Sequence, residues 1–279
     1  MPETLLSELA LAALFAVFIW WFSTGLVLLL DRMPHGALRW GHWLSSALAV
    51  TAFMALAHTA RELSVANAYC AFTCALLVWG WHELSFLSGW VTGPRKTALP
   101  PGVEGLPRFV EAVRAILWHE LAIIGVGLAV VVITWGEPNQ VGTHTFLVLW
   151  VMRTSAKLNL FFGVRNLSEE FLPPHLTYLQ SFFRRRPMNA LLPFSVLSAG
   201  VVLVLIVMQA AAPGTPPAAV VGAALVGTML ALAILEHLLL VLPIPSTALW
   251  RWALRNDGAA AMQPAAAPQI KEVTLEARP

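Results

Sequence analysis

Three glutamates lie inside long apolar segments of this sequence, and each is adjacent to a histidine. In chain order the pairs are His82-Glu83, His119-Glu120 and Glu236-His237. Ionisable groups are costly in hydrocarbon, so in membrane spans they usually face the interior of a helix bundle and mark a functional site. Imidazole and carboxylate groups ligate metals, and neutral imidazole also ligates the metal of a tetrapyrrole. We therefore expect one polar centre, competent for a metal or a tetrapyrrole, built from three helices.

The helices that must position this centre follow from the composition, which is that of a membrane protein. The chain has 279 residues, of which 58% are hydrophobic and only 11% are charged. With about 20 apolar residues per crossing, seven spans are expected, at 9–30, 43–60, 67–91, 109–135, 143–163, 189–211 and 217–243. The fold class is therefore all-α, a polytopic bundle of about seven transmembrane helices over residues 1–256. Residues 257–279 are rich in Ala and Pro and are expected to form a disordered cytoplasmic tail.

The positive charges between these spans predict the orientation. Lys and Arg concentrate in the first, third and fifth loops and in the tail, whereas the second loop has only Arg61. The N-terminus and the fourth and sixth loops have none. Because cytoplasmic loops carry the excess of Lys and Arg, we expect an N-out, C-in arrangement in a bacterial inner membrane.

This orientation places the three Glu/His pairs at a similar depth, in the cytoplasmic half of the bilayer. The fifth span adds Arg153, Lys157 and Asn159 at about the same depth. Arg153 and Lys157 are four residues apart and share a helix face. A buried cation needs an anionic partner, so we expect these two residues to pair with the embedded glutamates.

The fifth loop carries further polar residues and is predicted to be an interfacial helix-turn across the cytoplasmic mouth of the bundle. It contains Asn166, Glu169, Glu170 and His175, and a lid role is the natural expectation for them. Ser168 is expected to cap a short helix that contains the two glutamates.

Aromatic residues suggest two further roles. Trp81 and Trp118 each precede a His-Glu pair and could wall a flat ligand. His35 and His42 are predicted to flank an interfacial loop in which Trp40 and Trp43 form an aromatic belt.

Three interpretations of the Glu/His pairs remain open from the residues alone. The first is an ion-paired and hydrogen-bonded core without a ligand. The second is a carboxylate-bridged di-metal centre, although the Glu-x-x-His spacing of that class is absent. The third is haem or bacteriochlorophyll ligation by a neutral imidazole.

Several segments closely resemble one known family. They lie at residues 71–83, 117–121, 146–153, 155–159, 166–172, 186–189 and 235–237, and include the sequences WGWHE, LWHEL, NLSEEFL, RPMN and LEH. These segments resemble the photosynthetic complex assembly protein PuhE family of purple phototrophic bacteria, and the resemblance extends over residues 15–255.

This resemblance implies a multi-pass protein of the inner (intracytoplasmic) membrane, encoded among photosynthesis genes. Its implied role is to support assembly of the reaction centre and light-harvesting complex, or to modulate bacteriochlorophyll supply. The implied partners are subunits of that complex or pigment-synthesis enzymes, and no catalytic roles are transferred. Three classes of function follow: an assembly factor that binds or delivers bacteriochlorophyll or its precursor, an intramembrane metal-dependent oxidase or hydroxylase, and a pure interaction scaffold.

Overall fold

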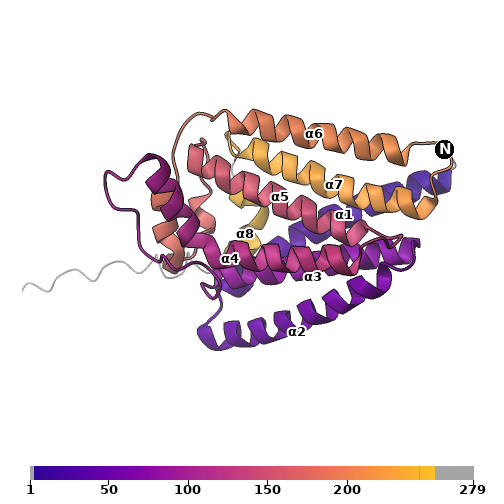
Figure 1. Ribbon diagram of the computed structural model, residues 1–279, viewed down its shortest axis with the longest axis horizontal. Helices are drawn as coiled ribbons and strands as arrows, with labels where there is room; N and C mark the ends of the chain where they lie inside the picture. Colours follow the sequence, from indigo (N-terminus) through magenta and orange to yellow (C-terminus); the bar gives the residue numbers. More distant parts are fainter. Residues whose placement is uncertain (1–2, 245, 255–279) are drawn as a thin grey trace, which may run out of the picture.

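The computed structural model describes residues 3–244 and 246–254, and within these ranges every regular element is a helix. Long helices run roughly side by side, and short helices gather at one end of the bundle (Figure 1). The long helices are α1 (Glu3–Asp31), α2 (His35–Thr59), α3 (Val65–Leu87), α4 (Gly105–Ile133), α5 (Val141–Phe162), α6 (Leu191–Ala210) and α7 (Pro217–Leu239). The short ones are η1 (Glu169–Phe171), η2 (Pro174–Phe182), η3 (Ser246–Trp250) and α8 (Arg251–Leu254). The predicted tail at residues 257–279 lies outside the described residues.

Six of these helices, α1 to α4, α6 and α7, are long and apolar enough to cross a membrane. Helix α5 has 22 residues, two more than α6, but is not among the six. It carries Arg153, Lys157 and Asn159, which lower its hydropathy. The seven expected spans therefore all correspond to helices, and six of them meet the criteria for a membrane span by length and composition.

Helices α3 and α7 form the centre of the bundle. In the apolar window of each, 61% of the residues are buried, compared with 17–22% in α1, α2, α4 and α6. Helix α3 packs against α1, α2, α5 and α7, and α7 also contacts α1, α5 and α6. His82 and His237 therefore lie on the two most enclosed helices.

Glycine allows two of these helix pairs to approach closely. A Cβ atom on Gly142 of α5 would collide with the side chain of Leu56 of α2, and one on Gly222 of α7 would lie 2.6 Å from Val141. Within a bilayer, close van der Waals packing between helices replaces the hydrophobic effect as the source of association, and small residues permit it.

Helix α4 bends near its middle, so its first turns run across the bundle and the rest runs along it (Figure 1). The loop between α3 and α4 inserts into the backbone hydrogen bonding at the bend. The amide of Arg95 donates to the carbonyl of Arg114, and the amide of His119 donates to the carbonyl of Thr92 at 2.9 Å. A group inserted into the hydrogen-bond ladder is a known cause of helix kinks. The sequence predicted an uninterrupted span over residues 109–135, and the bend places His119 where the helix changes direction.

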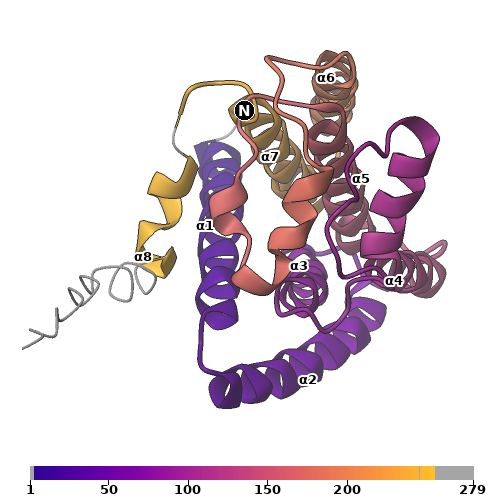
Figure 2. The ribbon, with the colours of Figure 1, turned by 90° about the vertical axis from the view of Figure 1, so that its left-hand side faces the viewer.

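The loop after α5 closes on itself and covers one end of the bundle. We name residues 164–185 the cap loop, and the end that it covers the cap end. An isolated bridge between Val164 and Arg185 joins its two ends. Its η2 packs Leu176, Leu179 and Phe182 in a cluster with Phe86 of α3. Figure 2 shows the cap loop crossing the end of the bundle between α1, α3 and α5.

Two local expectations differ from the structure. Ser168 precedes η1, but it has a left-handed backbone with φ of 53° and its side chain makes no capping hydrogen bond. The predicted cap is therefore wrong. Helix α2 begins at His35, so Trp40, His42 and Trp43 lie on its first turns and not in a loop.

Candidate functional site

His82 of α3 and His119 of α4 meet inside the bundle near the cap end. Their ring centroids are 6.5 Å apart, and each residue is only 1% exposed. Phe86 lies 4.5 Å from the His119 ring and Phe146 lies 6.3 Å from the His82 ring, measured between centroids. The two imidazoles that the sequence placed on separate helices are therefore brought together among apolar side chains.

All four ring nitrogens of this pair lack a hydrogen-bond partner among the described residues. Buried polar atoms in folded proteins nearly always have a partner, so each exception requires an explanation. An imidazole without a bonded anion in an apolar site is neutral, because a charge there would be costly. A neutral imidazole offers one lone pair and one N–H. His82 and His119 could therefore each accept a hydrogen bond or ligate a metal through the lone pair.

A row of ion pairs flanks the histidines and joins α5 to its two neighbours. Arg153 donates to Glu83 at 3.0 Å, and Lys157 donates to Glu120 at 2.6 Å. Adjacent residues on a helix point about 100° apart, so each His-Glu pair sends its imidazole inward and its carboxylate toward α5. The expected pairing of the fifth-span cations with these glutamates is present in the structure.

The third glutamate joins the row in a different way. Glu236 of α7 accepts a hydrogen bond from the indole nitrogen of Trp20 of α1 at 2.8 Å. Arg153 interacts with Glu236 electrostatically but is bonded to Glu83. Three carboxylates thus face two cations. The side chain of Arg153 is 44% exposed and Glu236 is also exposed, so this part of the row is not enclosed by protein.

His237 is separate from the other two histidines and is fully hydrogen-bonded. Its Nδ1 is hydrogen-bonded to the carbonyl of Ala233 at 2.9 Å, and its Nε2 is hydrogen-bonded to the Ser155 hydroxyl at 3.0 Å. Ser155 also bonds to Ser195 of α6 at 2.8 Å. Asn159 is fully buried beside them and donates to the carbonyl of Ser155. This group ties α5, α6 and α7 together, and His237 has no free nitrogen with which to bind a ligand.

Two polar side chains of the cap loop form hydrogen bonds to carbonyls at the ends of other helices. Asn166 donates to the carbonyls of Leu239 and Leu242 at the end of α7. His175 Nε2 donates to the carbonyl of Leu87 at the end of α3. The last carbonyls of a helix have no partner within it, so side chains that reach them stabilise the helix end. Asn166 and His175, two of the four residues expected to form a lid, thus fasten the cap loop to α7 and α3.

The two glutamates of η1 have smaller roles. Glu169 forms an ion pair with Arg185 at 3.5 Å, within the cap loop. The backbone carbonyl of Glu170 accepts a hydrogen bond from Arg32. Both contacts lie at the surface of the cap end and do not reach the histidines.

The two tryptophans next to the His-Glu pairs differ in position. Trp81 donates to Ser46 of α2 and lies with its ring centroid 5.0 Å from that of His82. Trp118 is 52% exposed on the outside of α4, so it does not line the pocket around His119. Among the described residues, no group of three or more His, Cys, Asp or Glu side chains has the arrangement needed to hold a metal ion. Across residues 3–244 and 246–254, the geometry therefore offers a two-imidazole site and no multidentate metal centre.

A protein-family model described as "Protein of unknown function (DUF3623)" matches residues 6–261, which is most of the chain. The chain belongs to the DUF3623 family. A protein of Rhodobacter capsulatus described as "Uncharacterized 30.4 kDa protein in puhA 5'region" is 39% identical over 251 residues. That alignment covers 88% of this chain and 90% of the relative. No solved structure matches the chain.

Sequence reasoning missed two residues of this DUF3623 chain that position the site. Arg108 is 4% exposed and donates to the carbonyls of Phe161 and Phe182, so it joins the first turns of α4 to the end of α5 and to the cap loop. Asn189 donates to the carbonyls of Asn159 and Gly163, and its oxygen accepts from the first amides of α6. Asn189 followed by an apolar run was a detectable helix-start signal, whereas nothing in the sequence distinguished Arg108 from the loop arginines.

Proposed function

We propose that this protein is an integral membrane assembly factor for the photosynthetic reaction centre and light-harvesting complex. The support is genomic and familial: the R. capsulatus relative is named for its position in the puhA 5' region, and the motifs of this chain resemble an assembly family. Subunits of that complex or pigment-synthesis enzymes are the proposed partners.

The proposal includes seven crossings of the bacterial inner membrane, N-out and C-in. Helix α5 serves as the seventh because Glu83 and Glu120 neutralise its two cations from within the bundle. The cap loop then lies at the cytoplasmic interface, on the side where Lys and Arg accumulate.

The activity proposed for the site is binding or delivery of bacteriochlorophyll or a precursor. The observation that carries this is the set of four unpartnered nitrogens on His82 and His119. A neutral imidazole is the axial ligand that the magnesium of such a pigment accepts. The donor chemistry therefore fits the pigment, but Phe86 and Phe146 pack against the two rings and leave no room for a macrocycle.

Access therefore requires α4 to separate from α3. Helix α4 is suited to such a movement because only a narrow stripe of it is buried. The stripe consists of Arg108, Ala115, His119, Ile123, Gly127 and Val130. The bend in α4 lies next to His119, so the proposed hinge is beside an imidazole that would ligate the pigment.

The test is pigment recovery from protein purified out of a phototrophic host. The wild-type protein is expected to retain bacteriochlorophyll or a precursor, with an absorption spectrum that shifts or disappears in His82→Ala and His119→Ala. His144→Ala is the matched control, because His144 is exposed near the opposite end of the bundle. If no pigment copurifies, or if both variants keep the full pigment content and still support assembly, the pigment proposal is wrong.

A pure scaffold is the second candidate, and the paired charges favour it. Both cations of α5 are already bonded to glutamates, so the row satisfies itself without any ligand. A scaffold predicts that assembly depends on the intact ion pairs and is unaffected by loss of the two imidazoles. The metal-dependent enzyme receives no comparable support, because the described residues contain no three-ligand group.

A further inference from the structure

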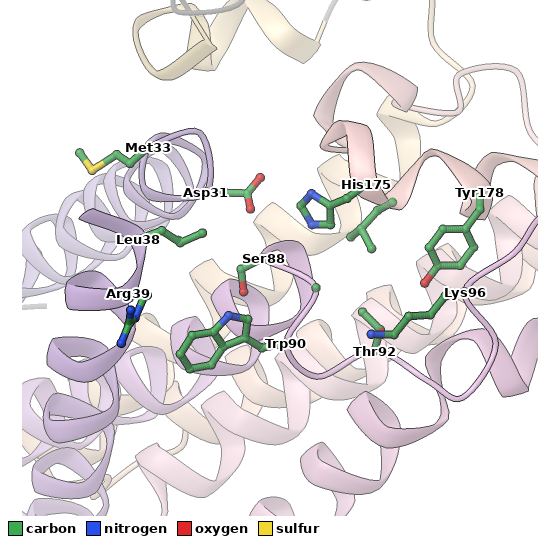
Figure 3. A pocket seen from close by; sticks show the side chains of 12 residues that line it. Asp31, Met33, Leu38, Arg39, Ser88, Trp90, Thr92, Lys96, His175 and Tyr178 are labelled. Carbon is green, nitrogen blue, oxygen red and sulfur yellow. The ribbon is translucent and has the colours of Figure 1, made fainter. Parts of the chain in front are cut away.

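A second polar site lies at the cap end, away from the histidine pair. It is a cavity of about 560 Å³ between the end of α1, the start of α2, the loop after α3, and η2. Figure 3 shows the side chains that line it. No residue of the histidine pair or of the ion-pair row belongs to its wall.

One corner of this cavity gathers three groups that can donate hydrogen bonds to an anion. Lys96 is exposed and forms no ion pair within the described part of the chain. Thr92 is only 2% exposed, yet its hydroxyl has no partner of good geometry. The Tyr178 hydroxyl faces Thr92, but the two fall short of a full hydrogen bond. Figure 3 shows Lys96, Thr92 and Tyr178 on the same side of the cavity.

The local electrostatics keep these donors available. Burial raises the pKa of the Tyr178 phenol above its ordinary value, so this group keeps its proton at neutral pH. Asp31, the acid in the cavity wall, lies across the cavity near His175 and apart from Lys96 (Figure 3). His175 itself is bonded to the carbonyl of Leu87. Arg39 adds a second cation on the wall formed by α2.

The rim of the cavity has the composition of a membrane interface. Trp90 lines the cavity, is 56% exposed and stacks on His42 at 3.9 Å. Trp40 and Trp43, which line a neighbouring hollow with Arg39, are 77% and 67% exposed. Exposed tryptophans at the end of apolar helices occupy the headgroup level of a bilayer. An anionic headgroup bound in this cavity would therefore lie at the level where the acyl chains of the same lipid can run along the helices.

We propose that this cavity binds the phosphate of a membrane glycerophospholipid, held by Lys96 and by the hydroxyls of Thr92 and Tyr178. The lipid would join α1, α2, the loop after α3 and the cap loop, all of which contribute to the wall. This site is independent of pigment binding and stands whether or not the histidines bind a ligand.

The test uses the purified full chain in an uncharged detergent, with dioleoyl phosphatidylglycerol as the probe and native mass spectrometry as the readout. We expect saturable binding of the lipid, and about tenfold weaker binding in Lys96→Gln, which loses a charged hydrogen bond. Thr92→Val should also weaken binding and Thr92→Ser should restore it. Arg165→Gln, the same charge change in an exposed residue of the cap loop outside the cavity, should bind as the wild type does.

Two outcomes would overturn the proposal. One is equal lipid binding by wild type, Lys96→Gln and Thr92→Val when all three give the same unfolding temperature. The other is displacement of the lipid by inorganic phosphate at equal concentration, which would assign the corner to a soluble anion. Resistance to inorganic phosphate supports the lipid, because the acyl chains then contribute to the affinity.

Discussion

Replacing Lys157 with methionine tests whether the ion-pair row stabilises the bundle by charge compensation. The Lys157 ammonium lies 2.6 Å from Glu120, and both side chains are 20% exposed. Removing one partner of a largely buried pair leaves an uncompensated charge, at a cost of about 3–5 kcal/mol. At about 2–4 °C of melting temperature per kcal/mol for a chain near this size, Lys157→Met should lower the midpoint by roughly 6–20 °C.

The decisive measurement is the double change. Glu120→Met alone should be similarly harmful, since it strands the ammonium. Lys157→Met combined with Glu120→Met removes both charges and keeps similar side-chain volumes, and such replacements are often close to neutral. The double variant should therefore be more stable than either single variant.

The measurement is thermal unfolding in detergent, followed by intrinsic tryptophan fluorescence. Applied to the wild type, the two single variants and the double variant, it completes a double-mutant cycle. Arg165→Met, which removes a cation from the exposed part of the cap loop, serves as the control and should shift the midpoint little. If the double variant loses as much stability as the two single losses added together, the two residues are energetically independent. Charge compensation would then not explain why they are present.

Two further predictions concern packing and orientation. Gly142→Leu should destabilise the bundle by about 1–3 kcal/mol, because the new side chain overpacks against Leu56. Gly200→Leu is the control and should not destabilise the bundle, because no atom lies near a Cβ at that position. Equal melting temperatures for the two variants would refute the close approach of α5 to α2. In whole cells, a membrane-impermeant maleimide should label Ala212→Cys in the sixth loop but not Ala98→Cys in the third, and the reverse pattern would refute the N-out, C-in arrangement.

The secondary structure was largely predictable from the sequence because hydrocarbon leaves the backbone no other choice. A chain crossing a bilayer must satisfy its backbone hydrogen bonds internally, so a long apolar run becomes a helix. All seven expected spans are helices in the structure. The exceptions are local. Helix α4 bends where the loop after α3 bonds to its backbone, a contact that no periodic pattern reports, and α2 begins earlier than expected, at His35.

The candidate site was predicted in part. Embedded charges must be neutralised, so the pairing of Arg153 and Lys157 with glutamates followed from their positions alone. The three histidines looked equivalent in the sequence, but they differ in the structure. His237 is satisfied by Ser155 and Ala233, whereas His82 and His119 are left without partners.

By itself the sequence determined which segments are helical and that acids and bases must meet near one end of the bundle. Both follow from the cost of unsatisfied polar groups in an apolar medium, which depends on residue type and position along the chain. Only the tertiary structure decided which imidazoles lie together, that the cap loop fastens the ends of α3 and α7, and that Lys96, Thr92 and Tyr178 line one cavity. Those relations depend on how each helix is rotated and bent against its neighbours, and side-chain packing across the whole bundle sets that rotation.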